Sequence, residues 1–324
     1  TLVHVSGKGV VISEPSVVAV ETKSRKVLAI GTEAKRMLGR TPANIVAIRP
    51  LRDGVISDAA VTEQMISYYV RKVHQGGWLS ARPRMIIGIP SGVTEVEKRA
   101  VRDAAIRAGA RWVRLVEEPM AAAIGAGMPI SEASGSMVLD IGGGTTEVAV
   151  ISMGGIVTAH SARVAGDELN EAIQEMFRTE FSLDVGENTA EEVKLQLGSA
   201  WPLDEELTAD VGGRDIATGL PRTQVVTSEE VRAALDASVG TIVEAIKTTL
   251  ERTPPELAAD IISQGLVLSG GGALLAGLPE RVTHETGIHA YLAPEPLYSV
   301  VLGCGLTLDN IEAMKGLTSQ SYFE

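Results

Sequence analysis

The stretch from Asp140 to Glu147 holds the residue types best suited to chemistry in this chain. It reads Asp-Ile-Gly-Gly-Gly-Thr-Thr-Glu and joins two apolar runs that each have the pattern of a β-strand. Three consecutive glycines have no Cβ, so their N–H groups can converge on an anion, and the adjacent carboxylate could hold a hydrated Mg²⁺. The alternative is a plain tight turn, which would need neither the carboxylate nor the two hydroxyls.

A second glycine run, Gly270–Gly272, follows a strand predicted at Leu266–Leu268. We expect a helix after it, around Leu274, because the first N–H groups of a helix can meet a phosphate or a nucleoside. Taken alone, this is a weak signal. Consecutive glycines do not fit the spaced glycines of a dinucleotide fingerprint, and no acidic residue stands at the usual distance. The sequence therefore disfavours a Rossmann-type oxidoreductase.

Two adjacent carboxylates, Glu117 and Glu118, follow a strand predicted at Trp112–Val116. Pro119 comes next and favours the first position of a helix, since its missing N–H does no harm there. A carboxylate at such a place could serve in general acid–base chemistry. The alternative is that both complement the helix dipole, which is worth about 0.3–1 kcal/mol each.

The predicted elements around these motifs alternate between strand and helix, which indicates an α/β fold. An antiparallel meander of short strands is predicted at Thr1–Val5, Val10–Ser13 and Val17–Glu21. Further predicted strands are 85–89, 137–141, 147–152 and 156–162, with short strands in 207–226 broken at Gly212-Gly213 and Gly219. Predicted helices cover 32–38, 58–74, 94–108, 119–125, 167–180, 187–197, 228–250 and 303–313. A meander followed by a helix occurs twice, which predicts two similar domains facing each other across a cleft.

Composition limits the classes of partner. The 324 residues are enough for about two domains. A formal net charge of -12 opposes binding to the phosphate backbone, so we expect no nucleic-acid partner. Apolar runs such as Met137–Ile141 are far shorter than the ~18 residues of a membrane span, so we expect a cytoplasmic protein.

Five runs, taken in order, resemble the MreB-type bacterial actins, within the superfamily of actin, heat-shock-chaperone and sugar-kinase ATPases. These runs are Ser13–Val18, Asp53–Ile56, Ile87–Pro90, Glu118–Gly125 and Asp140–Val148. The resemblance covers nearly the whole chain. It implies an actin-like ATPase fold, with two related α/β lobes around a nucleotide cleft, each built on a five-stranded sheet and carrying a smaller subdomain.

The resemblance also implies where the lobes begin and end. Residues 1–134 with about 303–324 would form the first lobe, whose small subdomain would cover about 22–57. Residues 135–302 would form the second lobe, with a small subdomain at about 171–239.

A site for ATP or ADP with Mg²⁺ follows from the same resemblance. The β- and γ-phosphates would be bound by Gly142, Gly143 and Gly144, and Asp140 would hold the metal through water. Glu118 would orient and deprotonate the attacking water, and Thr145 would hold that water in line. The adenosine loop would be Gly270, Gly271, Gly272 and Ala273. Ribose and adenine would be flanked by Glu191, Glu192, Val193 and Lys194, although a solvated pair of charges explains this helical segment equally well.

The function implied is a slow ATPase that polymerises into filaments of paired protofilaments. The filaments would lie at the inner face of the cell membrane and organise rod-shape cell-wall synthesis, with membrane proteins of the MreC, MreD and RodZ type as partners. Trp78 and Leu79 match an apolar loop that touches the membrane in this family; the alternative is that both pack into the core.

One departure from the family pattern concerns the first phosphate loop, an Asp-x-Gly-Thr hairpin expected immediately before Thr1–Val5. We expect the natural protein to carry this segment upstream of the sequence given. Without it, a non-hydrolysing nucleotide-binding scaffold is the alternative. A small-molecule kinase of the same superfamily is disfavoured, because the segment Thr32–Val55 is too small for an enlarged substrate lobe.

Overall fold

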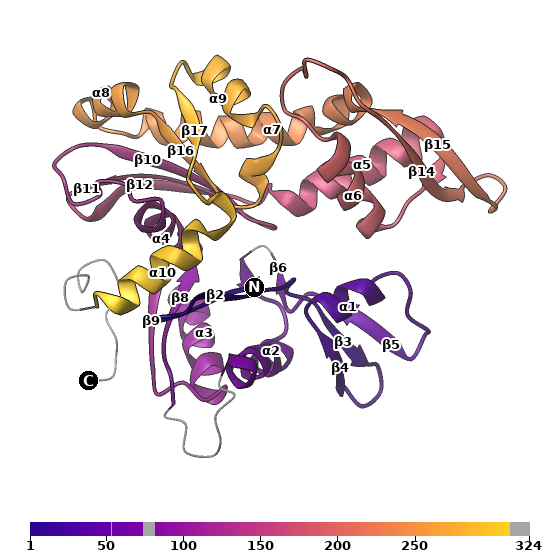
Figure 1. Cartoon of the computed structure of the whole chain (residues 1–324), viewed down its shortest axis with the longest axis horizontal. Coiled ribbons are helices and arrows are strands. Elements are labelled where there is room, and N and C mark those ends of the chain that lie inside the picture. Colours follow the sequence, from indigo (N-terminus) through magenta and orange to yellow (C-terminus); the bar gives the residue numbers. More distant parts are fainter. Residues whose placement is uncertain (53, 74–81, 312–324) are drawn as a thin grey trace. The chain divides into compact units, whose positions relative to one another are not determined.

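The computed structural model describes residues 1–52, 54–73 and 82–311. These residues form two compact units. Unit 1 contains Thr1–Glu132, Met153–Ile156 and the chain from Tyr298 onward, and unit 2 contains Ala133–Ser152 and Val157–Leu297. Strands and helices alternate in both units (Figure 1), so the α/β prediction is confirmed. The lobe and subdomain boundaries expected from the resemblance stay a prediction.

Unit 2 is built on a five-stranded mixed sheet in the order β12-β11-β10-β16-β17 (Figure 1). Strand β10 is antiparallel to β11 and parallel to β16, which is itself parallel to β17. The strands are β10 (Ser136–Ile141), β11 (Thr146–Ser152), β12 (Gly155–Ala162), β16 (Leu266–Ser269) and β17 (Ala290–Leu292). Because β10 and β16 run in the same direction, the glycine runs that follow them leave the same edge of the sheet, where ligands bind in open α/β sheets.

The core of unit 2 lies on one face of this sheet. Alternate β10 side chains, Met137, Leu139 and Ile141, are fully buried there with Phe177 and Ile242. Burying one such side chain stabilises the fold by about 1.5–3 kcal/mol. Since side chains alternate along a strand, Asp140 lies on the opposite face. The helices of unit 2 are α5 (Gly166–Phe181), α6 (Glu187–Leu197), α7 (Ser228–Glu251), α8 (Pro255–Gln264) and α9 (Leu278–Thr286).

A smaller sheet of unit 2 has the order β13-β14-β15, with β13 at Leu183–Asp184, β14 at Thr208–Asp215 and β15 at Pro221–Thr227. The predicted break at Gly212-Gly213 is wrong. Gly212 pairs with Thr223 inside the ladder, and neither glycine has a positive φ, so both continue the strand. Gly219, with φ +73°, lies in the turn that follows.

The strands described in unit 1 belong to several short sheets, so the five-stranded sheet expected for the first lobe is absent from the described residues. The sheets are β1 (Leu2–Val5) with β2 (Gly9–Ser13), β6 (Leu51–Arg52) with β7 (Val55–Ile56), parallel β8 (Arg84–Ile89) with β9 (Trp112–Glu117), and a three-stranded sheet. This last sheet has the order β4-β3-β5, with β3 at Val18–Glu21, β4 at Val27–Ile30 and β5 at Ile45–Ile48. The predicted meander is therefore half wrong. Strand β3 leaves β2, because a turn closed by the Glu21 amide on the Lys26 carbonyl folds β4 back onto it.

The helices of unit 1 are α1 (Thr32–Met37), α2 (Ala59–Val73), α3 (Glu95–Arg107), α4 (Glu118–Gly125) and α10 (Ser299–Asp309). Helix α10 packs closely on α4, because a Cβ at Gly303 would lie 1.8 Å from the Ala121 carbonyl oxygen. It also contacts β8 and β1, so it covers two of the short sheets. In the described ranges, no helix has both the length and the apolar character needed to cross a bilayer.

Candidate functional site

The first glycine run is the loop of a β-hairpin, as predicted. Strands β10 and β11 pair up to Ile141 and Thr146, and the Gly142 amide donates to the Thr145 carbonyl at 2.8 Å. Thr146 is fully buried and its hydroxyl donates to the Val164 carbonyl at 2.6 Å, so it anchors the hairpin. The Thr145 side chain is 8% exposed, and within the described residues its hydroxyl has no hydrogen bond. Of the two hydroxyls, only that of Thr145 is left for a ligand or a water.

Nothing within the described protein requires a glycine at position 143. It is exposed and does not have a positive φ. A Cβ built on it would meet only Asp167 Oδ2, at an ordinary distance of 3.9 Å. Glycine is therefore needed here neither by backbone strain nor by packing, whereas close approach of a ligand to the backbone would require it. This openness fits the phosphate groups of a nucleotide.

The first residues of helix α5 are hydrogen-bonded to the loop. The Gly166 amide donates to the Gly142 carbonyl at 3.2 Å, and the Asp167 amide donates to the Gly143 carbonyl at 2.7 Å. These first helical amides, which lack partners inside the helix, are thereby satisfied. Lys194 of α6 holds the same helix start, since its Nζ donates to the Gly166 carbonyl at 2.8 Å.

Asp140 lies just before the loop and is only 5% exposed. Its Oδ1 accepts a hydrogen bond of 2.7 Å from the Ser269 hydroxyl. Burial raises the pKa of Asp140 to about 6; the Ser269 hydrogen bond opposes this rise and the nearby charge of Glu147 adds to it. Glu147 stands directly opposite on β11, is fully buried, and accepts a hydrogen bond of 2.6 Å from the Ser161 hydroxyl. A nearby divalent cation would stabilise both carboxylates, and Mg²⁺ typically keeps several waters and takes one or two carboxylates.

The second glycine run packs against the base of the first. Gly270 has φ +85°, and a Cβ there would lie 2.2 Å from the Ile141 carbonyl oxygen. A Cβ on Gly272 would lie 2.3 Å from Ile141 Cγ2. The Gly270 amide donates to the Pro296 carbonyl at 2.8 Å. The structure thus brings the two predicted loops together at one edge of the sheet.

The helix predicted around Leu274 is present only as a short 3₁₀ helix. Gly272–Leu274 is a single 3₁₀ turn, and the next helix, α9, begins at Leu278. A phosphate site based on a helix N-terminus is therefore unsupported at this loop. Ala273 is 1% exposed and its side chain belongs to the core, so only its backbone could contact a nucleotide.

The segment predicted to flank ribose and adenine lies on α6. Val193 is 3% exposed and packs in the core of unit 2, while Glu191 is half-buried and Glu192 is exposed. Lys194 is half-buried against Gly166, as described above. Trp78 and Leu79, predicted for membrane contact, lie outside the described residues.

Glu118 belongs to unit 1, where it begins α4 directly after β9. It is half-buried beside Gly88, since a Cβ on that glycine would lie 3.3 Å from Glu118 Cγ. Burial of the Cys304 thiol, followed by the charge of Glu118, raises the pKa of this cysteine to about 12. Cys304 is therefore a neutral packing residue, and the carboxylate of Glu118 is the candidate for chemistry here.

Sequence reasoning missed Ser269 and Glu147, the buried neighbours of Asp140. A usable signal existed for each: Glu147 is a charge inside an apolar strand, and Ser269 is the polar last residue of the strand before Gly270. It also missed Gly166 and Asp167, whose contact with the loop depends on the fold and leaves no mark in the local sequence.

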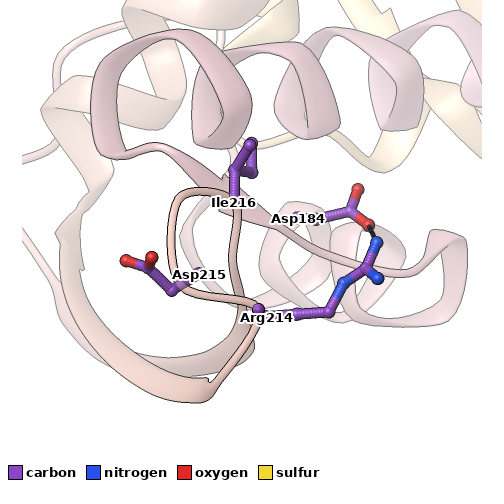
Figure 2. Close-up of a pocket in the computed structure, with 5 residues that line it drawn as sticks. Asp184, Arg214, Asp215 and Ile216 are labelled. Atoms are coloured by element: carbon purple, nitrogen blue, oxygen red, sulfur yellow. Dashed lines mark hydrogen bonds and ion pairs between the residues drawn. The ribbon is translucent and has the colours of Figure 1, made fainter.

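A hollow of about 310 Å³ lies elsewhere in unit 2, beside the small sheet. It is lined by Asp184, Arg214, Asp215, Ile216 and Gly219 and shares no residue with either glycine run. Figure 2 shows the Arg214 side chain paired with Asp184. The distance between Arg214 Nη2 and Asp184 Oδ2 is 2.9 Å. This exposed ion pair contributes about 0–1 kcal/mol. Because the hollow shares no residue with either glycine run, we do not consider it a candidate nucleotide site.

Known proteins share both the sequence and the fold. The family model described as MreB/Mbl protein matches residues 1–316. The cell shape-determining protein Mbl of Bacillus subtilis (strain 168) is 50% identical over 313 residues, which cover 97% of this chain and 94% of Mbl.

Among solved structures, MreB5 of Spiroplasma citri bound to ADP superposes with a TM-score of 0.92 at 35% identity, covering 97% of this chain and 94% of MreB5. The MamK double helical filament shares the fold, with a TM-score of 0.77 at 23% identity and 91% of each chain covered. Since the family match spans almost all of the sequence, this chain is a member of the MreB/Mbl family with an actin-like fold.

Proposed function

We propose that this chain binds ATP with Mg²⁺, hydrolyses it slowly, and assembles into membrane-associated filaments that organise rod-shape cell-wall synthesis. The observation that carries nucleotide binding is the open hairpin loop at Gly143, next to the buried Asp140. The ADP-bound and AMPPNP-bound structures of MreB5 support it, because that relative shares the fold at 35% and 34% identity.

In this proposal the two loops divide the nucleotide between them. The amides of Gly142, Gly143 and Gly144 bind the β- and γ-phosphates, and Asp140 holds Mg²⁺ through water. The backbone of 270–273 and the α6 segment 191–194 contact adenosine. Bound Mg²⁺ supplies positive charge that neutralises the phosphates during transfer.

Hydrolysis requires a positioned water in addition to these contacts. We assign Glu118 to orient this water and take its proton, and Thr145 to hold it in line. Phosphoryl transfer asks mainly for positioning and charge neutralisation, so one carboxylate and one hydroxyl suffice. The Thr145 hydroxyl, which has no hydrogen bond in the described part of the chain, supports this role.

Phosphate release by Glu118→Ala tests the hydrolytic function. We expect ATP binding and sedimentable assembly to persist, while phosphate release falls by at least about 10²-fold, which is typical for loss of a general base. Glu256→Ala, at an exposed position of α8, is the control. Phosphate release from Glu118→Ala at the wild-type rate would refute the assignment. A wild-type chain that binds ATP without turnover would instead be a nucleotide-binding scaffold.

Filament formation is supported by the shared fold, since MamK uses it in a double helical filament. The cell-shape role is supported by the relative Mbl of Bacillus subtilis, which is a cell shape-determining protein. We propose the inner membrane surface and proteins of the MreC, MreD and RodZ type as partners, with the protein at the cytoplasmic face of the membrane. Assembly should appear as protein that pellets with ATP above a threshold concentration.

Membrane contact is assigned to Trp78 and Leu79 on the sequence pattern alone. Burying both in lipid would yield about 3–6 kcal/mol at most, which avidity along a filament would convert to tight binding. The double variant Trp78→Ser and Leu79→Ser should no longer co-sediment with liposomes, while it should still assemble. Equal co-sedimentation of variant and wild type with liposomes would refute the assignment.

A further inference from the structure

Ser269 joins the two glycine runs through a buried hydrogen bond that the proposed function has not yet used. Its hydroxyl donates to Asp140 Oδ1 at 2.7 Å. Ser269 is 0% exposed and Asp140 is 5% exposed. Hydrogen bonds to charged groups in a buried setting are among the strong ones.

The backbone holds Ser269 in place from both sides. Asp140 and Ser269 are register partners in the parallel pair β10–β16. The next residue, Gly270, has φ +85° and lies against the Ile141 carbonyl. The Ser269 hydroxyl therefore has little freedom to move away from the carboxylate.

The other neighbours of Asp140 offer no substitute donor. Glu147, opposite on β11, is itself an acceptor whose Oε1 binds the Ser161 hydroxyl. In the described parts of the chain, the Ser269 hydroxyl is the one hydrogen-bond donor to the Asp140 side chain. The final torsion of an Asp side chain is broad, so without this donor the carboxylate could rotate and present either oxygen.

We propose that Ser269 is a positioning residue for the metal: by holding Oδ1, it leaves Asp140 Oδ2 as the oxygen that meets the hydrated Mg²⁺ of ATP. This inference rests on the proposed nucleotide function. It assigns to Ser269, the residue directly before the second glycine run, a role at the metal site beside the first run. Ser269 itself touches neither the metal nor the reacting phosphate.

The test is the Mg²⁺ dependence of ATP affinity, measured with a fluorescent ATP analogue in EDTA and across a Mg²⁺ titration. For Ser269→Ala we expect the Mg²⁺ midpoint to rise about tenfold, as for the loss of one hydrogen bond to a charged group. Affinity in EDTA should stay within about twofold of wild type, a split that a merely structural role would not produce. Ser136→Ala is the matched control, because Ser136 is 1% exposed at the start of β10 and its hydroxyl has no partner in the described residues.

A Mg²⁺ midpoint in Ser269→Ala equal to that of Ser136→Ala overturns the inference, and so does an equal loss of affinity with and without Mg²⁺. If Ser269→Ala does not fold, Ser269→Cys keeps the side-chain shape with a weaker donor and must shift the midpoint in the same direction; an unchanged midpoint overturns the inference. Wild-type protein that binds no ATP overturns the proposed function itself, and this inference with it.

Discussion

The two glycine runs of unit 2 look alike in sequence, but they are glycine-rich for different reasons. In 270–272 the reason is internal: Gly270 has a left-handed backbone, and Gly270 and Gly272 both press on Ile141. In 142–144 no glycine has a positive φ, and a Cβ at the centre of the run, Gly143, would meet only Asp167 Oδ2, at an ordinary 3.9 Å.

This difference separates a structural glycine from a functional one. Where packing requires glycine, a substitution should destabilise the protein. Where neither packing nor backbone strain requires glycine, the close approach of a ligand to the backbone can explain it. The glycines of the second run are explained by packing, and we propose that those of the first run bind the phosphates.

The largest effect should come from Gly270→Ala. The new Cβ would meet the Ile141 carbonyl and sit on a left-handed backbone, so we expect the free energy of unfolding to fall by about 3–5 kcal/mol. Urea unfolding measures it. Gly240→Ala is the control: Gly240 lies in α7 and a Cβ there would have no neighbour within 4 Å, so alanine should stabilise the helix by about 0.5–1 kcal/mol. A Gly270→Ala variant as stable as wild type would remove the distinction between the runs.

The next effect concerns Asp140, at the junction of the runs. Its pKa of about 6 lies above its ordinary value of 3.8, so the folded state holds the proton more tightly than the unfolded state. Stability should therefore fall as pH rises from about 4 to about 6 and then level off, a loss of about 3 kcal/mol at about 1.4 kcal/mol per pKa unit.

Asp140→Asn should lack this fall and be more stable than wild type at pH 7. The measurement is urea unfolding between pH 4 and pH 8, in EDTA and without nucleotide. Parallel pH profiles for variant and wild type would show that the carboxyl is not held as described.

A smaller effect is expected at Lys194, which the resemblance places at the nucleotide and the structure places on the Gly166 carbonyl. Lys194→Met should lower the free energy of unfolding by about 1.5–3 kcal/mol, since it removes a hydrogen bond from a charged donor. Exposed Glu192→Gln on the same helix should stay within about 0.5 kcal/mol of wild type. If Lys194→Met weakens ATP binding and leaves stability unchanged, the lysine acts on the nucleotide and not on the loop support.

Local chemistry made the hairpin at 142–145 predictable, because β-branched runs on both sides of three glycines allow few other structures. Helix α8, in contrast, was not predicted. Pro255 opens this helix, at a first position where proline is tolerated. Only Ile261 of the helix is buried.

The contacts that complete the site were out of reach of sequence reasoning. Asp140 and Ser269 meet across 129 positions of sequence, and Lys194 reaches Gly166 across 28. Such pairs depend on the register of β10 with β16 and on the packing of α6 on α5, which no local pattern encodes. The residues of the loops could be named in advance, whereas their partners could not.

The most direct test of the open loop is the nucleotide affinity of Gly143→Ala beside its stability. Its Cβ would make one ordinary contact in the protein, 3.9 Å from Asp167 Oδ2, but would occupy the place proposed for phosphate. We predict an ATP dissociation constant at least about tenfold higher, AMP binding within about twofold of wild type, and a free energy of unfolding within about 0.5 kcal/mol of wild type. An unchanged ATP affinity in a fully folded Gly143→Ala protein would contradict this prediction.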